Sequence, residues 1–212
     1  MTPYYADEWV TLHHGDCLEV TDWLAADVLV TDPPYGLGDR MSGGPEWGKL
    51  WTDGTANGSR PLTWDASAPA WIPAIASRFT AAIIWGGNYF NLPPSRGWLV
   101  WDKIVRNFTS GHCELAWTSL DQPVRAYNFA HAQLASEGKL HPTQKPVGLM
   151  EWSISFTPPG TIADPFAGSG STLVAAKALG RKAIGVELEE RYCEIAARRL
   201  AQDVLDFTGG AS

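Results

Sequence analysis

Short apolar runs alternate with helix-like stretches along this 212-residue chain, and this alternation constrains the possible fold more than any other feature. The apolar runs predict strands over 9–13, 28–31, 81–85, 98–101, 114–118, 162–164 and 183–187. Apolar residues at helical spacing predict helices over 146–156, 173–179 and 189–205. Because this order is typical of βα units, we expect one α/β domain over residues 1–212, with a mostly parallel, doubly wound sheet.

Three segments depart from this alternation. Residues 36–65 are rich in Gly, Trp and Pro and have no sustained periodicity. A loop of this length in a compact domain is usually either functional or disordered, so we expect a substrate-side loop here, with a tolerated insertion as the alternative. Residues 121–140 form a short interval before the next helix, and 207–212 are expected to be a tail.

The net charge of −7 argues against a protein that holds DNA by broad neutralisation of phosphates. Any contact with nucleic acid must therefore be local. The cations that could make such contacts, or could simply be solvated, are Arg40, Lys49, Lys103, Arg106, Arg125, Lys139 and Lys145.

Cysteine usage and hydropathy exclude other classes of protein. The three cysteines are scattered and form no CxxC pair, so neither a disulfide framework nor a zinc site is expected, and a reducing cytoplasm fits best. The N-terminus has no signal-peptide pattern, and no apolar run approaches the roughly 20 residues that span a bilayer. We therefore expect a cytoplasmic protein without a membrane role.

A carboxylate, two prolines and an aromatic residue follow the strand expected at 28–31. This tetrad, Asp32-Pro33-Pro34-Tyr35, lies at the carboxyl edge of the sheet, where open α/β sheets bind ligands. Because proline has no N–H, nearby carbonyls remain free to accept hydrogen bonds. Two acceptors and a flat ring suit the exocyclic amine of a base. A rigid turn without a chemical role is the alternative.

A glycine-containing turn follows the strand expected at 162–164. In Asp164-Pro165-Phe166-Ala167-Gly168-Ser169-Gly170, the glycines allow the backbone to turn tightly and approach a ligand. The Gly-Lys-Ser/Thr of a P-loop is missing. Glu187, at the end of the next strand, is placed to accept hydrogen bonds from ribose hydroxyls, unless it is only a surface acid. These features favour an adenosine-type cofactor without a pyrophosphate.

The tetrad and the glycine turn together resemble the amino-methyltransferases of DNA. Because the tetrad comes first, the chain is similar to the permuted β group, which also carries a HPTxKP segment, here His141-Pro142-Thr143-Gln144-Lys145-Pro146. Gly15-Asp16 and Trp85-Gly86-Gly87-Asn88-Tyr89 match two further motifs. The resemblance extends over nearly the whole chain, from about residue 10 to residue 200.

The resemblance implies a Rossmann-like methyltransferase domain that uses S-adenosylmethionine. It places Glu187 at the cofactor ribose and Asp16 near the cofactor adenine. It places Lys145 at the cofactor carboxylate, although Lys145 could instead contact a DNA phosphate or stay solvated. We expect no metal and no cysteine nucleophile. The expected cofactor-binding residues are Asp16, Cys17, Thr143, Lys145, Asp164, Phe166, Gly168, Ser169, Gly170 and Glu187.

The expected catalytic residues are Asp32, Pro33, Pro34 and Tyr35, acting on a base flipped out of double-stranded DNA. Tyr35 would stack on the base, while the Asp32 side chain and the Pro33 carbonyl accept the amine protons and orient the nitrogen for direct displacement. An aspartate in the first position favours adenine N6, because cytosine N4 enzymes of the family more often have serine there. The alternatives are cytosine N4, RNA as the substrate, and a non-catalytic module that binds cofactor or DNA.

The interval 121–140 is short for a target-recognition region, so we expect a short or degenerate recognition site. Alternatively, the 36–65 loop or a second subunit of a homodimer supplies the missing contacts. We expect a prokaryotic or phage enzyme. Restriction-modification, phage modification and regulation are the alternative biological roles.

Overall fold

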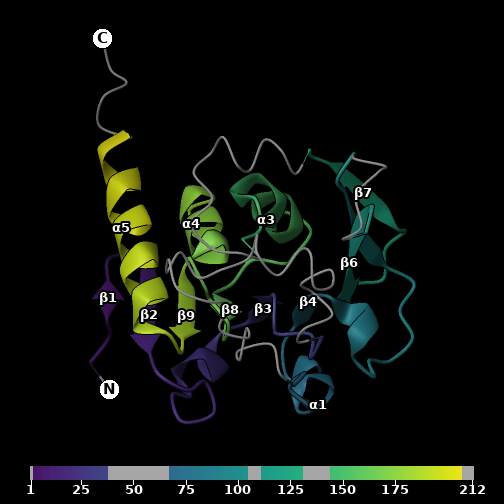
Figure 1. The fold of residues 1–212 in the computed structure, drawn as a ribbon, viewed down its shortest axis with the longest axis horizontal. Helices are drawn as coiled ribbons and strands as arrows, with labels where there is room; N and C mark the ends of the chain where they lie inside the picture. The colour runs from purple at the N-terminus through teal and green to yellow at the C-terminus, as the bar shows by residue number, and fades with distance from the viewer. Residues whose placement is uncertain (1, 38–66, 105–110, 131–143, 207–212) are drawn as a thin grey trace, which may run out of the picture.

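A computed structural model of the chain describes residues 2–37, 67–104, 111–130 and 144–206, with side chains up to residue 202. These residues carry one nine-stranded sheet in the order β1-β2-β9-β8-β3-β4-β6-β5-β7 (Figure 1). Its strands are β1 (Tyr5–Ala6), β2 (Val10–His14), β3 (Val28–Thr31), β4 (Ala81–Trp85), β5 (Trp98–Asp102), β6 (Cys113–Thr118), β7 (Arg125–Asn128), β8 (Ile162–Asp164) and β9 (Ala183–Glu187).

The middle of the sheet is parallel. β2, β9, β8, β3 and β4 pair in parallel, as do β5 and β7, whereas β1 and β6 pair antiparallel with their neighbours. Every residue of β3 and β4 is buried, because parallel strands in such sheets are covered on both faces. The prediction of a mostly parallel α/β domain is confirmed.

Helices cover both faces of the sheet (Figure 1). One face packs against α3 (Val147–Ile154), α4 (Ser171–Ala178) and α5 (Glu190–Asp206), and the other against α1 (Ile72–Ala76) and the 3₁₀ helix η1 (Asp22–Ala25). Side chains alternate between the two resulting cores along each strand, with Val28 and Val30 in the first and Leu29 in the second. The helices predicted from periodicity are α3, α4 and α5.

The winding of the sheet reverses between β8 and β3. From β8 the chain continues outward to β9, whereas from β3 it continues in the opposite direction to β4. Ligands of open α/β sheets bind in the crevice outside the carboxyl ends of the strands at such a point. The fold therefore brings the end of β3, with the tetrad, next to the end of β8, with the glycine turn.

Several predicted segments lie outside the described residues: 38–65 of the substrate-side loop, 131–140 of the recognition interval and the 207–212 tail. The described part of the recognition interval contains β7. None of the described helices is both long enough and apolar enough to cross a bilayer.

Candidate active site

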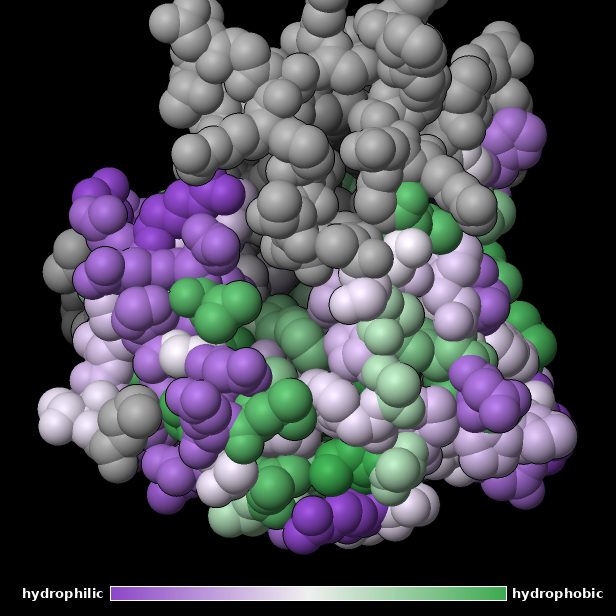
Figure 2. All heavy atoms as spheres, turned by 60° about the horizontal axis from the view of Figure 1, so that its bottom comes forward, coloured by the Kyte–Doolittle hydropathy of each residue, from purple (hydrophilic) through white to green (hydrophobic). Residues whose placement is uncertain are grey.

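A pocket opens at the carboxyl ends of β2, β3, β8 and β9. Its empty space, together with the open solvent at its mouth, is about 1050 Å³. Figure 2 brings this lower side of the molecule forward and shows a recess with hydrophobic surface beside a hydrophilic flank. Lys145 is the one cation among the described lining residues, and the lining carboxylates are Asp16, Asp32, Asp164, Glu187 and Glu189. This excess of negative charge favours a ligand that carries positive charge.

The glycine turn between β8 and α4 forms one wall. At Gly168, where φ is +52°, an added Cβ would meet no heavy atom within 4 Å, so this glycine leaves space for a ligand. At Gly170, where φ is +83°, an added Cβ would lie 2.8 Å from the Cβ of Ala196 in α5. Arg199 of α5 donates a hydrogen bond of 2.6 Å to the Ser169 carbonyl and supports the turn from behind. The two glycines thus serve different purposes, ligand access and helix packing.

Glu187 ends β9 and closes the turn. Its Oε2 accepts a hydrogen bond from the Gly168 amide at 2.7 Å, and its Oε1 accepts one from the Glu189 amide at 2.8 Å. Burial raises the pKa of Glu187, and these backbone donors oppose the rise. Because an ionised carboxylate has about four acceptor sites, Glu187 can accept further hydrogen bonds from a ligand.

Asp164 lies beneath the turn and is only 1% exposed. Its Oδ1 accepts hydrogen bonds from the Thr31 hydroxyl at 2.8 Å and from the Phe166 amide at 3.1 Å. Burial raises the pKa of Asp164 to about 6 against the effect of its hydrogen bonds. Asp164 therefore connects β3, which leads into the tetrad, to the glycine turn.

An aromatic stack supports two walls of the pocket. Trp71 stacks on Phe166 with ring centroids 5.7 Å apart, and Trp23 packs against Trp71 at 5.9 Å. The Trp23 indole N–H donates a hydrogen bond of 2.9 Å to the Cys17 carbonyl. Because Phe166 and Cys17 both line the pocket, the two tryptophans hold its walls in one arrangement.

The tetrad follows β3 and meets a second aromatic residue. Tyr35 stacks on Tyr89 of the 3₁₀ helix η4 (Gly87–Tyr89), with ring centroids 5.0 Å apart and ring planes 20° apart. Tyr89 is 46% exposed, so this pair extends from the tetrad to the surface. It provides a flat aromatic surface next to Asp32.

Both carboxylate oxygens of Asp32 accept hydrogen bonds. The Tyr35 hydroxyl donates to Oδ1 at 2.5 Å, and the Lys145 ammonium donates to Oδ2 at 2.5 Å. Lys145 Nζ also lies 3.1 Å from Oε2 of Glu114 on β6.

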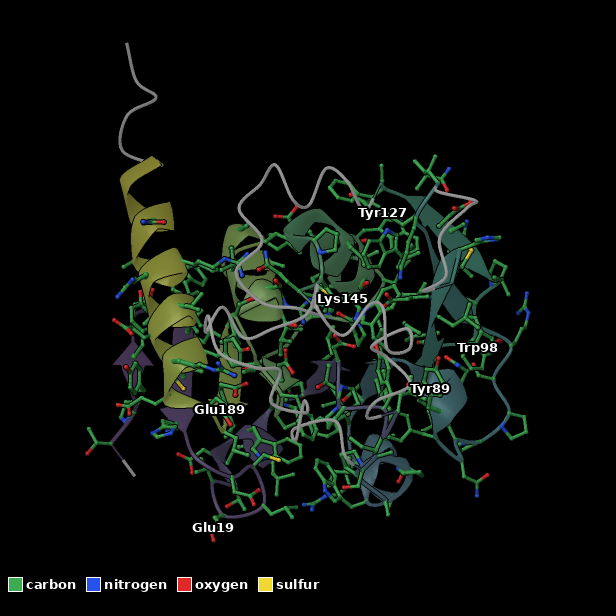
Figure 3. All side chains as sticks on the ribbon, viewed as in Figure 1. Glu19, Tyr89, Trp98, Tyr127, Lys145 and Glu189 are labelled. Carbon is green, nitrogen blue, oxygen red and sulfur yellow. The ribbon has the colours of Figure 1, made fainter. Side chains whose placement is uncertain are left out.

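Glu114 binds a second ammonium, because its Oε1 pairs with Lys103 Nζ at 2.7 Å. Figure 3 shows Lys145 near the middle of the molecule, between Glu189 on one side and Tyr89 on the other. The tetrad is therefore part of a cluster of two carboxylates and two ammonium groups.

The environment keeps Glu114 and Lys145 of this cluster charged. Burial favours a raised pKa for Glu114, but Lys145 and Lys103 outweigh it and lower the pKa to about 2. Burial disfavours the charged form of Lys145, yet Asp32 and Glu114 outweigh that effect and raise its pKa. The pKa of Asp32 is raised by burial and by Glu114, with Lys145 acting in the opposite direction. Glu114 and Lys145 are consequently ionised at neutral pH.

The structure gathers most of the predicted site residues around the pocket. Asp16, Cys17, Asp32, Pro34, Lys145, Asp164, Phe166, Gly168, Ser169 and Glu187 line it. Pro33 and Gly170 are buried, Tyr35 is bound to Asp32, and Thr143 lies outside the described residues. The sequence analysis missed Glu114, although a charged residue at the start of the predicted strand 114–118 was a usable signal.

Two cations considered as DNA contacts are buried. Lys103 is 6% exposed and Lys145 is 5% exposed, and both bind carboxylates. The interpretation of Lys103 as a DNA-facing cation is wrong, because Glu114 neutralises it below the surface. Lys145 is not solvated and lies on the tetrad. Arg125 of β7 is exposed, and the remaining four, Arg40, Lys49, Arg106 and Lys139, lie outside the described residues.

Comparison with known proteins identifies the family. The family profile described as DNA methylase matches residues 84–198, more than half of the chain. The chain belongs to this DNA methylase family. The matched region of this DNA methylase includes Glu114, Lys145, the glycine turn and Glu187.

Curated relatives match this DNA methylase over most of its length. The type II methyltransferase M2.LlaDCHI of Lactococcus lactis subsp. cremoris is 28% identical over 261 residues, covering 93% of this chain and 91% of the relative. The type II methyltransferase M.ScaI of Streptomyces caespitosus is 25% identical over 267 residues, covering 93% of this chain and 83% of the relative.

Solved structures share the fold of this DNA methylase. M1.HpyAVI, crystallised as a complex with SAM, aligns with a TM-score of 0.57 and 22% identity over 90% of this chain and 98% of that chain. PvuII DNA methyltransferase, described as cytosine-N4-specific, aligns with a TM-score of 0.58 and 16% identity over 96% of this chain and 93% of that chain. The Rossmann-like methyltransferase fold is confirmed.

S-adenosylmethionine is the cofactor of this family, and the pocket of this DNA methylase fits it. Gly168 leaves open space beside the turn, Glu187 retains acceptor capacity, and the acidic lining suits a positively charged sulfonium. When bound, the cofactor supplies a methyl group on that sulfur. This DNA methylase therefore methylates an exocyclic amino group in DNA, either N6 of adenine or N4 of cytosine.

Proposed function

We propose that this DNA methylase methylates N6 of an adenine that is flipped out of double-stranded DNA. Asp32 carries the proposal, because it lines the cofactor pocket and also hydrogen-bonds to Tyr35. The amine acceptor, the aromatic surface and the source of the methyl group thus converge at one residue. A stacked base cannot present its amine in line with the methyl group, so flipping is required and costs a few kcal/mol.

Asp32 and Tyr35 have different proposed roles toward the base. Tyr35, extended by Tyr89, offers the surface on which the base stacks. Asp32 accepts a hydrogen bond from the amine, which turns the nitrogen lone pair toward the methyl group. The new N–C bond forms as the S–C bond breaks, and the electron pair of that bond stays on sulfur. The carboxylate stabilises the positive charge that develops on nitrogen, and the surplus proton leaves through it to solvent.

The aspartate in the first tetrad position supports adenine as the target. Cytosine N4 enzymes of the family more often have serine there, and this chain has Asp32. The alignment with M2.LlaDCHI extends over more positions than this chain contains, so that relative carries additional segments. A compact chain with a short recognition interval supports a short or degenerate target sequence, read by one copy or by a homodimer. The type II relatives support a role in restriction-modification.

The methylated nucleoside tests this proposal. The chain is expressed in a host without DNA methyltransferases, the host DNA is hydrolysed, and its nucleosides are identified by mass spectrometry. We expect N6-methyladenine. N4-methylcytosine in its place would contradict the adenine assignment, and the absence of both would contradict the proposed activity. Sequencing of the same DNA tests the target, because a long motif modified uniquely would contradict a degenerate site.

A further inference from the structure

The Lys145 ammonium already donates a hydrogen bond to Asp32, as the target amine is proposed to do. It lies 2.5 Å from Oδ2, while the Tyr35 hydroxyl holds Oδ1 at the same distance. The proposed function requires a target amine to donate to this carboxylate. The amine would therefore share Asp32 with an ammonium of the protein itself, whose charge partly neutralises the carboxylate.

A cation on Asp32 opposes the chemistry proposed for that residue. The amine nitrogen gains positive charge as the methyl group is transferred, and a carboxylate neutralised by a nearby ammonium stabilises that charge poorly. The Lys145 side chain is only 4% exposed, so solvent does little to screen its charge. Efficient transfer therefore requires Lys145 to withdraw from Asp32 without leaving the buried cluster, where an unpaired charge would be costly.

Glu114 provides the place to which Lys145 can withdraw. Its Oε2 is buried and pairs with Lys145 Nζ at 3.1 Å, a longer contact than the 2.5 Å between Lys145 and Asp32, and no other described donor reaches that oxygen. Its other oxygen, Oε1, is held by the buried Lys103 at 2.7 Å, which fixes the carboxylate in position. A short movement of the ammonium thus exchanges one carboxylate for another within a charge-balanced cluster.

We propose that Lys145 is a stand-in for the target amine in the base-free enzyme and that Glu114 is a positioning residue, which takes up the Lys145 ammonium when the amine binds Asp32. This inference rests on the proposed role of Asp32. Lys145 favours the ionised form of the carboxylate and holds it in place before the base arrives. Glu114 then prevents the same lysine from blocking the acceptor.

The test compares Glu114→Gln, Glu114→Asp, Lys145→Met and the double variant Glu114→Gln/Lys145→Met. Methyl transfer from labelled S-adenosylmethionine to unmethylated genomic DNA is measured with enzyme in excess over the sites. Cofactor affinity is measured by calorimetry and folding by thermal unfolding. Glu194→Gln is the matched control, because Glu194 is exposed on α5 and pairs only with Arg198 among the described side chains.

We expect Glu114→Gln to lower the transfer rate constant by about 100-fold, with cofactor affinity unchanged. Near pH 9, which favours the carboxylate form of Asp32, the double variant should be faster than Glu114→Gln, because no ammonium remains to neutralise Asp32. Glu114→Asp keeps the charge and should retain more activity than Glu114→Gln. A structural role alone would make the double variant no faster than the single one.

The inference is overturned if Glu114→Gln transfers methyl groups like Glu194→Gln, or if the double variant is no faster than Glu114→Gln. Should Glu114→Gln fail to fold, Glu114→Asp and Glu114→Asp/Lys145→Met provide the same comparison. Asp32→Ala separates this inference from the proposed function. An active Asp32→Ala would reject the proposed function, whereas an inactive Asp32→Ala with a fully active Glu114→Gln would reject only the role of Glu114.

Discussion

An added Cβ on Gly86 would lie 2.0 Å from Cε1 of Tyr35, so this glycine is in direct contact with the ring of the tetrad. Gly86 immediately follows β4, and its φ of +67° is one that side-chain-bearing residues rarely adopt. The neighbouring strand therefore sets the position of the ring that is proposed to stack on the base. Changing Gly86 should affect catalysis without any contact with the cofactor.

Gly86→Ala is expected to displace Tyr35 and to lower methyl transfer by about 10- to 100-fold, because misplacement of about 1 Å has effects of this size. Cofactor affinity should be unchanged, since Gly86 does not line the pocket. Gly180→Ala is the matched control, because Gly180 has a φ of +62° but no heavy atom within 4 Å of an added Cβ. Both variants should lose about 1 kcal/mol of stability from backbone strain. Equal loss of activity in the two variants would contradict the role of the ring contact.

Glu187→Gln is expected to weaken cofactor binding by about 10- to 100-fold, the effect of losing hydrogen bonds to a charged group. Both carboxylate oxygens accept backbone N–H groups, so either orientation of the amide sets its NH₂ against a donor. Isothermal titration calorimetry with S-adenosylmethionine measures this effect. Glu194→Gln, which removes a charge from the exposed part of α5, should bind normally. Unchanged affinity in Glu187→Gln would exclude Glu187 from the cofactor site.

Trp71→Ala is expected to weaken cofactor binding although its side chain does not line the pocket, because it removes the ring that backs Phe166 at 5.7 Å. Trp71→Phe keeps an aromatic ring and should retain most of the affinity. An aromatic pair is worth about 0.5–1.5 kcal/mol, so we expect a loss of about 3- to 10-fold in Trp71→Ala. Calorimetry that gives equal affinities for Trp71→Ala and the wild type would contradict the coupling.

Asp164→Asn should change how stability depends on pH. The pKa of Asp164 is raised from 3.8 to about 6 by burial, so between these values the folded chain binds more protons than the unfolded chain. The stability that this carboxyl contributes is therefore present below pH 3.8 and is lost as the pH rises through about 6. Asparagine does not titrate but keeps an acceptor for Thr31 and Phe166.

Urea unfolding at about pH 4 and about pH 7 checks this prediction. Over that interval, Asp164→Asn should gain about 2 kcal/mol of stability relative to the wild type. A difference between the two proteins that does not vary with pH would show that Asp164 is not protonated on folding near neutrality.

Sequence reasoning predicted the elements whose signal is local. β3 and β4 are continuous apolar runs, and α5 has a clear apolar stripe, so their predicted bounds agree with the structure to within one residue. β7 was missed because its residues are mostly exposed and carry no alternating pattern; it forms by pairing with β5. α1 was missed because it has only five residues and includes Pro73.

The functional site also contains residues whose positions have a local sequence signal and residues whose positions do not. Asp32, Gly168 and Glu187 follow strands that the sequence predicts, so their convergence at one edge was predictable. The contact of Lys145 with Glu114 depends on tertiary structure: β6 reaches the site by antiparallel pairing, with Trp101 opposite Glu114. Lys145 approaches from a segment 113 residues beyond Asp32 in the sequence. Neither relationship has a local sequence signal.

The most direct test of the central claim is methyl transfer by Asp32→Ala, measured together with its affinity for S-adenosylmethionine. Labelled cofactor and unmethylated genomic DNA give the transfer rate, and calorimetry gives the affinity. We predict that transfer is abolished while the cofactor still binds, because Asp32 holds the amine and other residues hold the cofactor. Retained transfer by a folded Asp32→Ala would contradict the account.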